Sequence, residues 1–169
     1  LRGMNLGGRR ITNDRLIEVI TSLGHPDAAA YQASGNVLLT GPPADPDALS
    51  ARLTDALGYP VPCLVRSADD IAGFVSWQPF DRSNTDGRGS RGKPQLIMVT
   101  QQVTPADVAA LSEGSGDLLE VHAGGHDVAW SPVAGLADSD LDLAAIDRRF
   151  GPSTVTTFGT IERLAGKLG

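Results

Sequence analysis

The sequence has a single cysteine, Cys63, among its 169 residues. An internal disulfide and a cysteine-rich zinc site are therefore both excluded. A chain of this length buries enough apolar surface to fold without such cross-links. Because disulfides mark oxidising compartments, the low cysteine content favours a cytoplasmic protein. We expect a globular protein located in the cytoplasm.

Long apolar runs and an excess of positive charge are also missing. No run of apolar residues approaches the ~20 residues that a membrane-spanning helix needs. The 14 basic side chains are outnumbered by 20 acidic ones, which gives a net charge of -6. A protein whose whole surface contacts nucleic acid would be basic. The composition therefore argues against a membrane partner and leaves only a local basic patch for binding anions.

The apolar periodicity predicts an α+β fold made of two halves that share one element order. In each half a strand, a helix, a hairpin of two strands, a helix and a further strand follow one another. The ranges are 1–6, 13–24, 28–33, 36–40, 45–58 and 61–65 in the first half, and 95–100, 105–111, 118–123, 126–130, 139–150 and 154–156 in the second. The order βαββαβ is that of a ferredoxin-like unit. We expect two ferredoxin-like halves in tandem, with antiparallel sheets and helices on one face.

The predicted domain organisation has three parts. Residues 1–67 form the first ferredoxin-like half, residues 68–93 a connecting helix and polar loop, and residues 94–169 the second half with a C-terminal helix. Residues 81–93 contain no apolar side chain and several turn-forming residues. We expect this stretch to be an exposed, poorly ordered loop.

The expected topology brings distant parts of the first half together. The strand at 1–6 should lie between the strands at 36–40 and 61–65. In a βαββαβ unit the end of the first strand and the turn of the hairpin lie at the same end of the sheet. Residues 5–10 should therefore face residues 34–36.

The residues at this end have the chemistry of an anion site. Glycines let backbone N–H groups approach a ligand, arginines supply charge, and the following helix presents its positive end. The predicted ligand-binding residues are Arg2, Asn5, Gly7, Gly8, Arg9, Ser34, Gly35 and Asn36. The expected partner is an anionic small molecule that carries a phosphate or, second, a carboxylate. The competing interpretation is that the glycines form turns and the arginines are solvated.

Other candidate residues favour structural roles. His122 and His126 bracket Gly124-Gly125, but two histidines without a third ligand favour ordinary strand residues over a metal site. Cys63 has no sequence neighbour that would activate it, so a buried position is favoured over a nucleophile. No metal or cofactor is predicted, and the sequence assigns neither catalytic residues nor a reaction nor an oligomeric state.

Two other classes of function compete with ligand binding. The first is a structural or protein-interaction module with no ligand site. The second is an RNA-binding module, because RNA recognition modules share the βαββαβ order. Such modules stack bases on aromatic side chains of their central strands, whereas aromatic residues make up 5% of this sequence. The RNA-binding interpretation therefore ranks below the other two.

Two motifs resemble those of the bacterial domain of unknown function family 1697. Residues 1–8 read LRGMNLGG and residues 31–37 read YQASGNV, similar to the L-R-G-x-N-x-G-G and Y-x-x-S-G-N-V of that family. The Pro79-Phe80 pair resembles its N-P-F segment. The resemblance implies two ferredoxin-like halves and brings no established activity. Residues 154–161 depart from the family's T-x-R-N-W-x-T-V, because they lack its arginine, asparagine and tryptophan.

Overall fold

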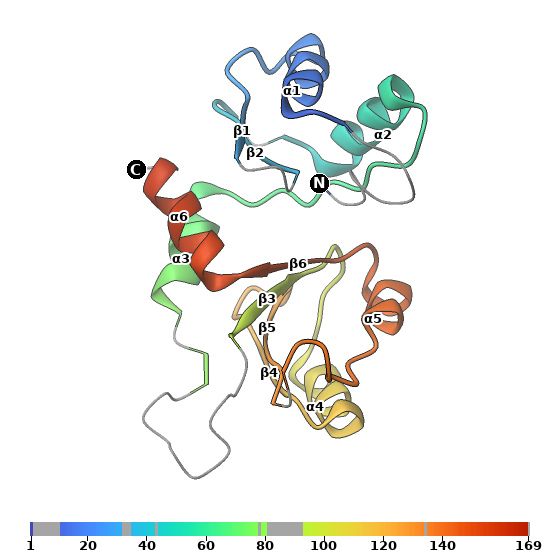
Figure 1. Ribbon diagram of the computed structural model, residues 1–169, viewed down its shortest axis with the longest axis vertical. Helices are drawn as coiled ribbons and strands as arrows, with labels where there is room; N and C mark the ends of the chain where they lie inside the picture. The colour runs from blue at the N-terminus through green and yellow to red at the C-terminus, as the bar shows by residue number, and fades with distance from the viewer. Residues whose placement is uncertain are drawn as a thin grey trace. The chain divides into compact units, whose positions relative to one another are not determined.

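The computed structural model describes residues 1, 11–31, 35–42, 44–77, 79–80, 93–133 and 135–168. The chain divides into two compact units, Leu1–Ser67 and Ala68–Lys167 (Figure 1). Within the described ranges, no helix combines the length and the apolar character needed to cross a membrane.

The described residues of the first unit form two helices and a hairpin. These elements are α1 (Asn13–Ser22), β1 (Ala29–Tyr31), β2 (Asn36–Leu38) and α2 (Pro46–Leu57). The strands pair antiparallel, with Ala29 opposite Leu38 and Tyr31 opposite Asn36. The apolar stripe of α1 is buried in one cluster with two leucines of α2; its members on the two helices are Leu16, Val19, Ile20, Leu49 and Leu53. The predicted helices and hairpin of this unit are confirmed.

The strand predicted at 61–65 is wrong, because residues 61–67 form neither helix nor strand. Pro60 and Pro62 flank Val61, and proline has no N–H to donate to a strand ladder. The backbone of Val61 is instead satisfied by α2: its N–H donates to the Thr54 hydroxyl at 3.0 Å, and its carbonyl accepts from the Ser50 hydroxyl at 2.8 Å. The other predicted neighbour, the strand at 1–6, falls largely on residues outside the described ranges.

The second unit contains a four-stranded antiparallel sheet and four helices in its described residues. The elements are α3 (Ala68–Ser76), β3 (Gln95–Met98), α4 (Pro105–Ser115), β4 (Leu118–Val121), β5 (Asp127–Ser131), α5 (Leu143–Phe150), β6 (Thr154–Thr157) and α6 (Phe158–Leu168). The strand order is β4-β5-β3-β6. From β3 to β6 the elements follow the predicted order βαββαβ. A pair of ferredoxin-like halves in tandem remains a prediction.

Helices α4 and α5 pack on one face of this sheet, whereas α3, which precedes the βαββαβ stretch, covers the other face. The register places Ile97 beside Val128, facing α4 and α5, and Leu96 beside Ala129 on the opposite face. Leu96 and Ala129 are both fully buried. Glu120, directly opposite Ala129 in the register, binds Trp77 at the end of α3. Helix α3 therefore lies on the face away from α4 and α5. The ring contact between Trp77 and Phe158, with centroids 6.0 Å apart, places the start of α6 near the end of α3 (Figure 1).

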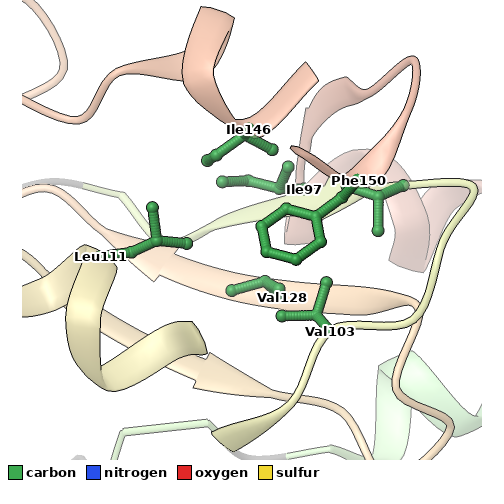
Figure 2. A pocket seen from close by; sticks show the side chains of 7 residues that line it. Ile97, Val103, Leu111, Val128, Ile146 and Phe150 are labelled. Atoms are coloured by element: carbon green, nitrogen blue, oxygen red, sulfur yellow. The ribbon is translucent and has the colours of Figure 1, made fainter. Parts of the chain in front are cut away.

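The α4–α5 side of the sheet holds an apolar core with a small cavity. Figure 2 shows the lining side chains, which come from β3, β5, α4, α5 and the loop after β3 and are Ile97, Val99, Val103, Leu111, Val128, Ile146 and Phe150. The cavity measures about 10 Å³, and its lining is entirely apolar. A water molecule needs about 10–15 Å³ and polar partners, so this space is a packing gap rather than a ligand site.

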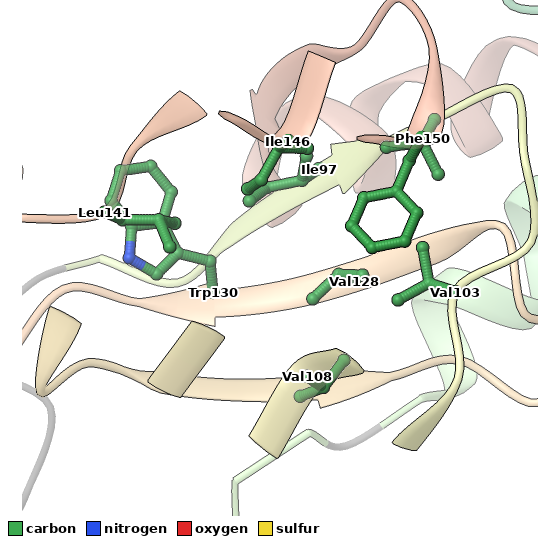
Figure 3. Close-up of a cluster of buried hydrophobic side chains, with 9 residues drawn as sticks. Ile97, Val103, Val108, Val128, Trp130, Leu141, Ile146 and Phe150 are labelled. Carbon is green, nitrogen blue, oxygen red and sulfur yellow. The ribbon is translucent and has the colours of Figure 1, made fainter. Parts of the chain in front are cut away.

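The same core continues toward Trp130 and Leu141, which pack together away from Phe150 (Figure 3). Helix α5 starts later than the predicted residue 139. The side chain of Asp142 accepts from the amide of Ala145 at 2.9 Å and so caps the helix. Ser139 does not cap α5, because its hydroxyl donates to the buried carboxylate of Asp117. The sequence predicted Ser139 as the start of the helix, but Ser139 makes a tertiary hydrogen bond to Asp117 instead.

Candidate functional site

The hairpin of the first unit turns at Gly35, which has a φ of 76°. This left-handed conformation favours glycine, so Gly35 suits the turn between β1 and β2. The backbone nitrogen of Leu1 donates to the carbonyl oxygen of Gly35 at 2.9 Å, across 34 positions of the sequence. Leu1 also packs against the apolar cluster of this unit. The first residue of the chain therefore lies directly against the hairpin turn.

Two of the predicted ligand-binding residues are described, and both lie at this turn. Gly35 forms the turn, and the half-buried Asn36 begins β2 opposite Tyr31. The remaining six predicted residues lie outside the described ranges; they are Arg2, Asn5, Gly7, Gly8, Arg9 and Ser34. The predicted exposed loop at 81–93 lies outside them as well, except for Lys93. The anion site therefore remains a prediction.

The buried position predicted for Cys63 is confirmed, because its side chain is 4% exposed. Its thiol contacts the carbonyl oxygen of Val61 at 3.5 Å. Burial raises the pKa of the Cys63 thiol to about 11. The reactive species of a cysteine is the thiolate, so Cys63 is not activated as a nucleophile.

His122 has a packing role at the end of β4. Its ring lies edge-on to Phe74 and Trp77, with centroid distances of 5.1 and 4.9 Å. Its Nδ1 accepts from the amide of Gly124 at 3.4 Å. His126, on the other side of the Gly-Gly turn, is exposed. Within the described part of the chain, no group of three or more His, Cys, Asp or Glu side chains is placed to hold a metal ion.

Two carboxylates of the second unit were not predicted as important. Asp117 is 4% exposed and accepts hydrogen bonds from Trp130, Val133 and Ser139. Glu120 is exposed, and its carboxylate accepts from the indole of Trp77 and the amide of Phe80. An isolated acidic residue in a turn or a strand carries no sequence signal for such contacts, because the partners lie 13 to 43 residues away.

The model of one protein family matches residues 1–128 of the chain, and its description is "Protein of unknown function (DUF1697)". The chain belongs to the DUF1697 family. The predicted resemblance is thus confirmed at the level of the family. The match ends at residue 128, before the stretch at 154–161 that departs from the family's C-terminal motif.

One solved structure shows the fold of this DUF1697 protein along its whole length. The conserved bacterial protein SP0830 from Streptococcus pneumoniae aligns with a TM-score of 0.64 and 17% sequence identity. The alignment covers 100% of this chain and 96% of that chain. A search of curated proteins finds no match. At this identity the likeness concerns the fold, and it carries no ligand or activity across.

Proposed function

We propose that this DUF1697 protein binds a phosphate or carboxylate group of a small molecule at the turn of the β1–β2 hairpin. The observation that carries the proposal is the hydrogen bond between the Leu1 nitrogen and the Gly35 carbonyl oxygen, 2.9 Å long. It anchors the start of the glycine- and arginine-rich segment beside Asn36. The sequence predicts that residues 5–10 face residues 34–36, and the residue types of both stretches suit an anion.

The residues that follow Leu1 supply the groups that such a ligand needs. Arg2 and Arg9 provide positive charge, Asn5 an amide donor, and Gly7 and Gly8 backbone N–H groups without side chains in the way. The first helix then begins with Thr12 as its N-cap, where the hydroxyl accepts from the amide of Arg15. The partial positive charge at a helix start favours an anion nearby. These residue types favour a phosphate over a neutral ligand.

The structure of the second unit weakens the RNA-binding alternative. A sheet that stacks bases needs one face open to solvent. Here Ile97 on one face of the central strand β3 and Leu96 on the other are both fully buried. The interaction-module alternative remains as the outcome of a negative binding test.

We also propose a cytoplasmic location and the three-part division 1–67, 68–93 and 94–169.

The test is isothermal titration of the parent and of Arg9→Ala and Asn36→Ala with a phosphate monoester, and with acetate as the carboxylate probe. We expect the phosphate ester to bind more tightly, and binding to weaken with added salt because exposed charges are screened. Removing one charged donor should cost about 1–3 kcal/mol of binding free energy. The matched control is Arg52→Ala, which removes an exposed arginine from α2 of the same unit.

Circular dichroism of each variant establishes that it has folded before its affinity is compared. Equal affinities in the parent, Arg9→Ala and Asn36→Ala would overturn the ligand site and leave the interaction module. If Arg52→Ala lowers the affinity as much as Arg9→Ala does, the effect reflects only the change in net charge. That result would also overturn the site.

A further inference from the structure

Tyr31 is the aromatic residue of the YQASGNV motif, and it has no role in the proposed anion site. It ends β1, and its register partner across the hairpin is Asn36. Directly opposed side chains of an antiparallel pair lie on the same face, with Cβ atoms about 4.5–5.5 Å apart. The side chain of Tyr31 therefore lies on the same face of the hairpin as the amide group of Asn36.

The two faces of the hairpin differ in what they contact. Val37 packs against the apolar cluster formed by α1 and α2, and its register partner is Ala30. Because side chains alternate between faces along a strand, Tyr31 and Asn36 project from the opposite, outer face. Leu38 lies on this outer face too, diagonally across from Tyr31. The outer face thus combines a polar amide with an aromatic ring and an aliphatic side chain.

The two tyrosines of the chain have different surroundings. The ring of Tyr59 packs against the apolar cluster of the first unit, to which both α1 and α2 contribute. Among the described residues, Tyr31 is not part of that cluster, and its side chain is half-buried on the other face. Tyrosine is enriched at binding surfaces, because its ring offers flat apolar area while its hydroxyl stays hydrated. Tyr31 therefore has the position of a contact residue rather than of a core residue.

The comparable hairpin face of the second unit is covered by a helix. The ring of His122, at the end of β4, lies edge-on to Phe74 of α3 at 5.1 Å and to Trp77 at 4.9 Å. In the first unit, α1 and α2 both pack on the Val37 side of the hairpin. The outer face with Tyr31 is therefore the hairpin face that these two helices leave for a ligand.

We propose that the ligand of the first unit is a phosphate ester of a planar aromatic ring, and that this ring stacks on Tyr31. The inference rests on the proposed function, because the phosphate must lie at the turn beside Asn36 for the attached group to reach Tyr31. Aromatic pairs in offset-stacked or edge-to-face arrangements gain stability beyond the area that they bury. An aliphatic group of equal size gains only the apolar contact. Tyr31 then determines which phosphate esters bind.

The test is isothermal titration with inorganic phosphate, phenyl phosphate and cyclohexyl phosphate. The two esters carry the same charge on groups of similar size, and only phenyl phosphate is aromatic. Inorganic phosphate reports on the anion site alone. The proteins are the parent, Tyr31→Phe, which keeps a ring, and Tyr31→Leu, which keeps an apolar side chain without a ring. The matched control is Tyr59→Leu, which removes the tyrosine ring that packs in the core of the same unit.

We expect the parent to bind phenyl phosphate about three- to tenfold more tightly than cyclohexyl phosphate. Tyr31→Phe and Tyr59→Leu should keep this ratio, whereas Tyr31→Leu should bind both esters equally. Inorganic phosphate should bind with the same affinity to the parent and to both Tyr31 variants, because Tyr31 contacts only the ring of the ligand.

The failure of this inference differs from the failure of the anion site. If inorganic phosphate binds but the parent does not distinguish the two esters, or if the ratio survives in Tyr31→Leu, the aromatic ligand is overturned and the anion site stands. If none of the three probes binds to the parent, both proposals are overturned.

A second measurement decides where circular dichroism shows that Tyr31→Leu has not folded. Nuclear Overhauser contacts in the parent, from the ring of bound phenyl phosphate to the ring of Tyr31, would support the inference. The Tyr31 resonances are assigned by comparison with Tyr31→Phe. A bound phenyl ring without contacts to Tyr31 would overturn the inference.

Discussion

Asp117 is the buried carboxylate around which one end of the second unit is organised. Its Oδ2 accepts from the Trp130 indole at 2.8 Å and from the Ser139 hydroxyl at 2.5 Å, and its Oδ1 accepts from the Val133 amide at 3.0 Å. These donors belong to β5 and to the chain between β5 and α5. The three neutral donors replace the water that the charge loses on burial, which is the condition for burying a carboxylate.

Asp117→Ala should destabilise the second unit by about 3 kcal/mol, because it leaves buried donors without an acceptor and removes hydrogen bonds to a charged group. Urea unfolding followed by tryptophan fluorescence measures this directly, since Trp77 and Trp130 both belong to this unit. Asp138→Ala, in the exposed part of the following loop, is the control and should change little. A free energy of unfolding for Asp117→Ala equal to that of the control would contradict the anchoring role.

At the scale of elements, local chemistry decided most of what the sequence could predict. Asp45-Pro46 and Gly58 predict both ends of α2, and the structure shows Asp45 as the N-cap and Gly58 in the left-handed C-cap. Both cap signals act within a few residues, so no tertiary information is needed. The start of α5 was misplaced because Ser139 binds Asp117, 22 residues away.

For the strand predicted at 61–65, the sequence predicted burial correctly but predicted the wrong secondary structure. Its apolar residues are buried, with Val61 at 0% and Cys63 at 4% exposure, so the pattern correctly predicted burial. Burial alone does not make a strand, because a strand also needs ladder hydrogen bonds. Pro60 and Pro62 cannot donate them, and the Thr54 and Ser50 side chains satisfy Val61 instead.

Two glycines of the second unit should respond in opposite ways to alanine. Gly73 lies inside α3, and an added Cβ would meet nothing nearer than His122 Nε2, at 4.0 Å. Gly73→Ala should therefore stabilise the protein by about 0.5–1 kcal/mol through helix propensity. Gly151 has a φ of 78°, and its added Cβ would clash with the Thr100 hydroxyl.

Gly151→Ala should accordingly lower the melting temperature, while Gly73→Ala raises it, in calorimetry of both variants under one condition. The steric clash adds to the cost of a left-handed conformation for alanine. The expectation fails if the two variants shift the melting temperature in the same direction.

For the whole molecule, the sequence predicted better which segments form helices and hairpins than which distant side chains meet. The turn at Gly35 was predicted because its residues are adjacent, whereas the hydrogen bond from Leu1 to Gly35 joins residues 34 positions apart. The contact between Glu120 and Trp77 joins residues 43 positions apart and two elements whose packing has no local signal. Sites of the first kind are accessible to sequence reasoning, whereas those of the second kind need coordinates.

The response of the second unit to acid follows from two helix caps. Hydrogen bonds from Thr104, assisted by Arg149, lower the pKa of Asp107 at the start of α4. The Ala145 amide, assisted by Arg148, lowers the pKa of Asp142 at the start of α5. A carboxyl with a lowered pKa in the folded state stabilises the fold above its unfolded-state pKa, about 3.9 for Asp. That stabilisation is lost as the pH falls through the folded-state pKa.

The double variant Asp107→Asn/Asp142→Asn removes both charges and keeps an acceptor oxygen at each position. Asn serves as an N-cap in place of Asp142, and the Asn side-chain oxygen can accept from Thr104 in place of Asp107, the third residue of the capping box of α4. At pH 7 it should be less stable than the parent, and the difference should shrink as the pH falls below about 4, where the parent's own carboxyls become protonated. Urea midpoints by tryptophan fluorescence at several pH values between 7 and 2.5 measure the difference. Asp138→Asn, an exposed residue of the same unit, should match the parent throughout. A difference that stays constant over the whole range would show that the two caps act through shape alone, and that their charge contributes nothing to stability.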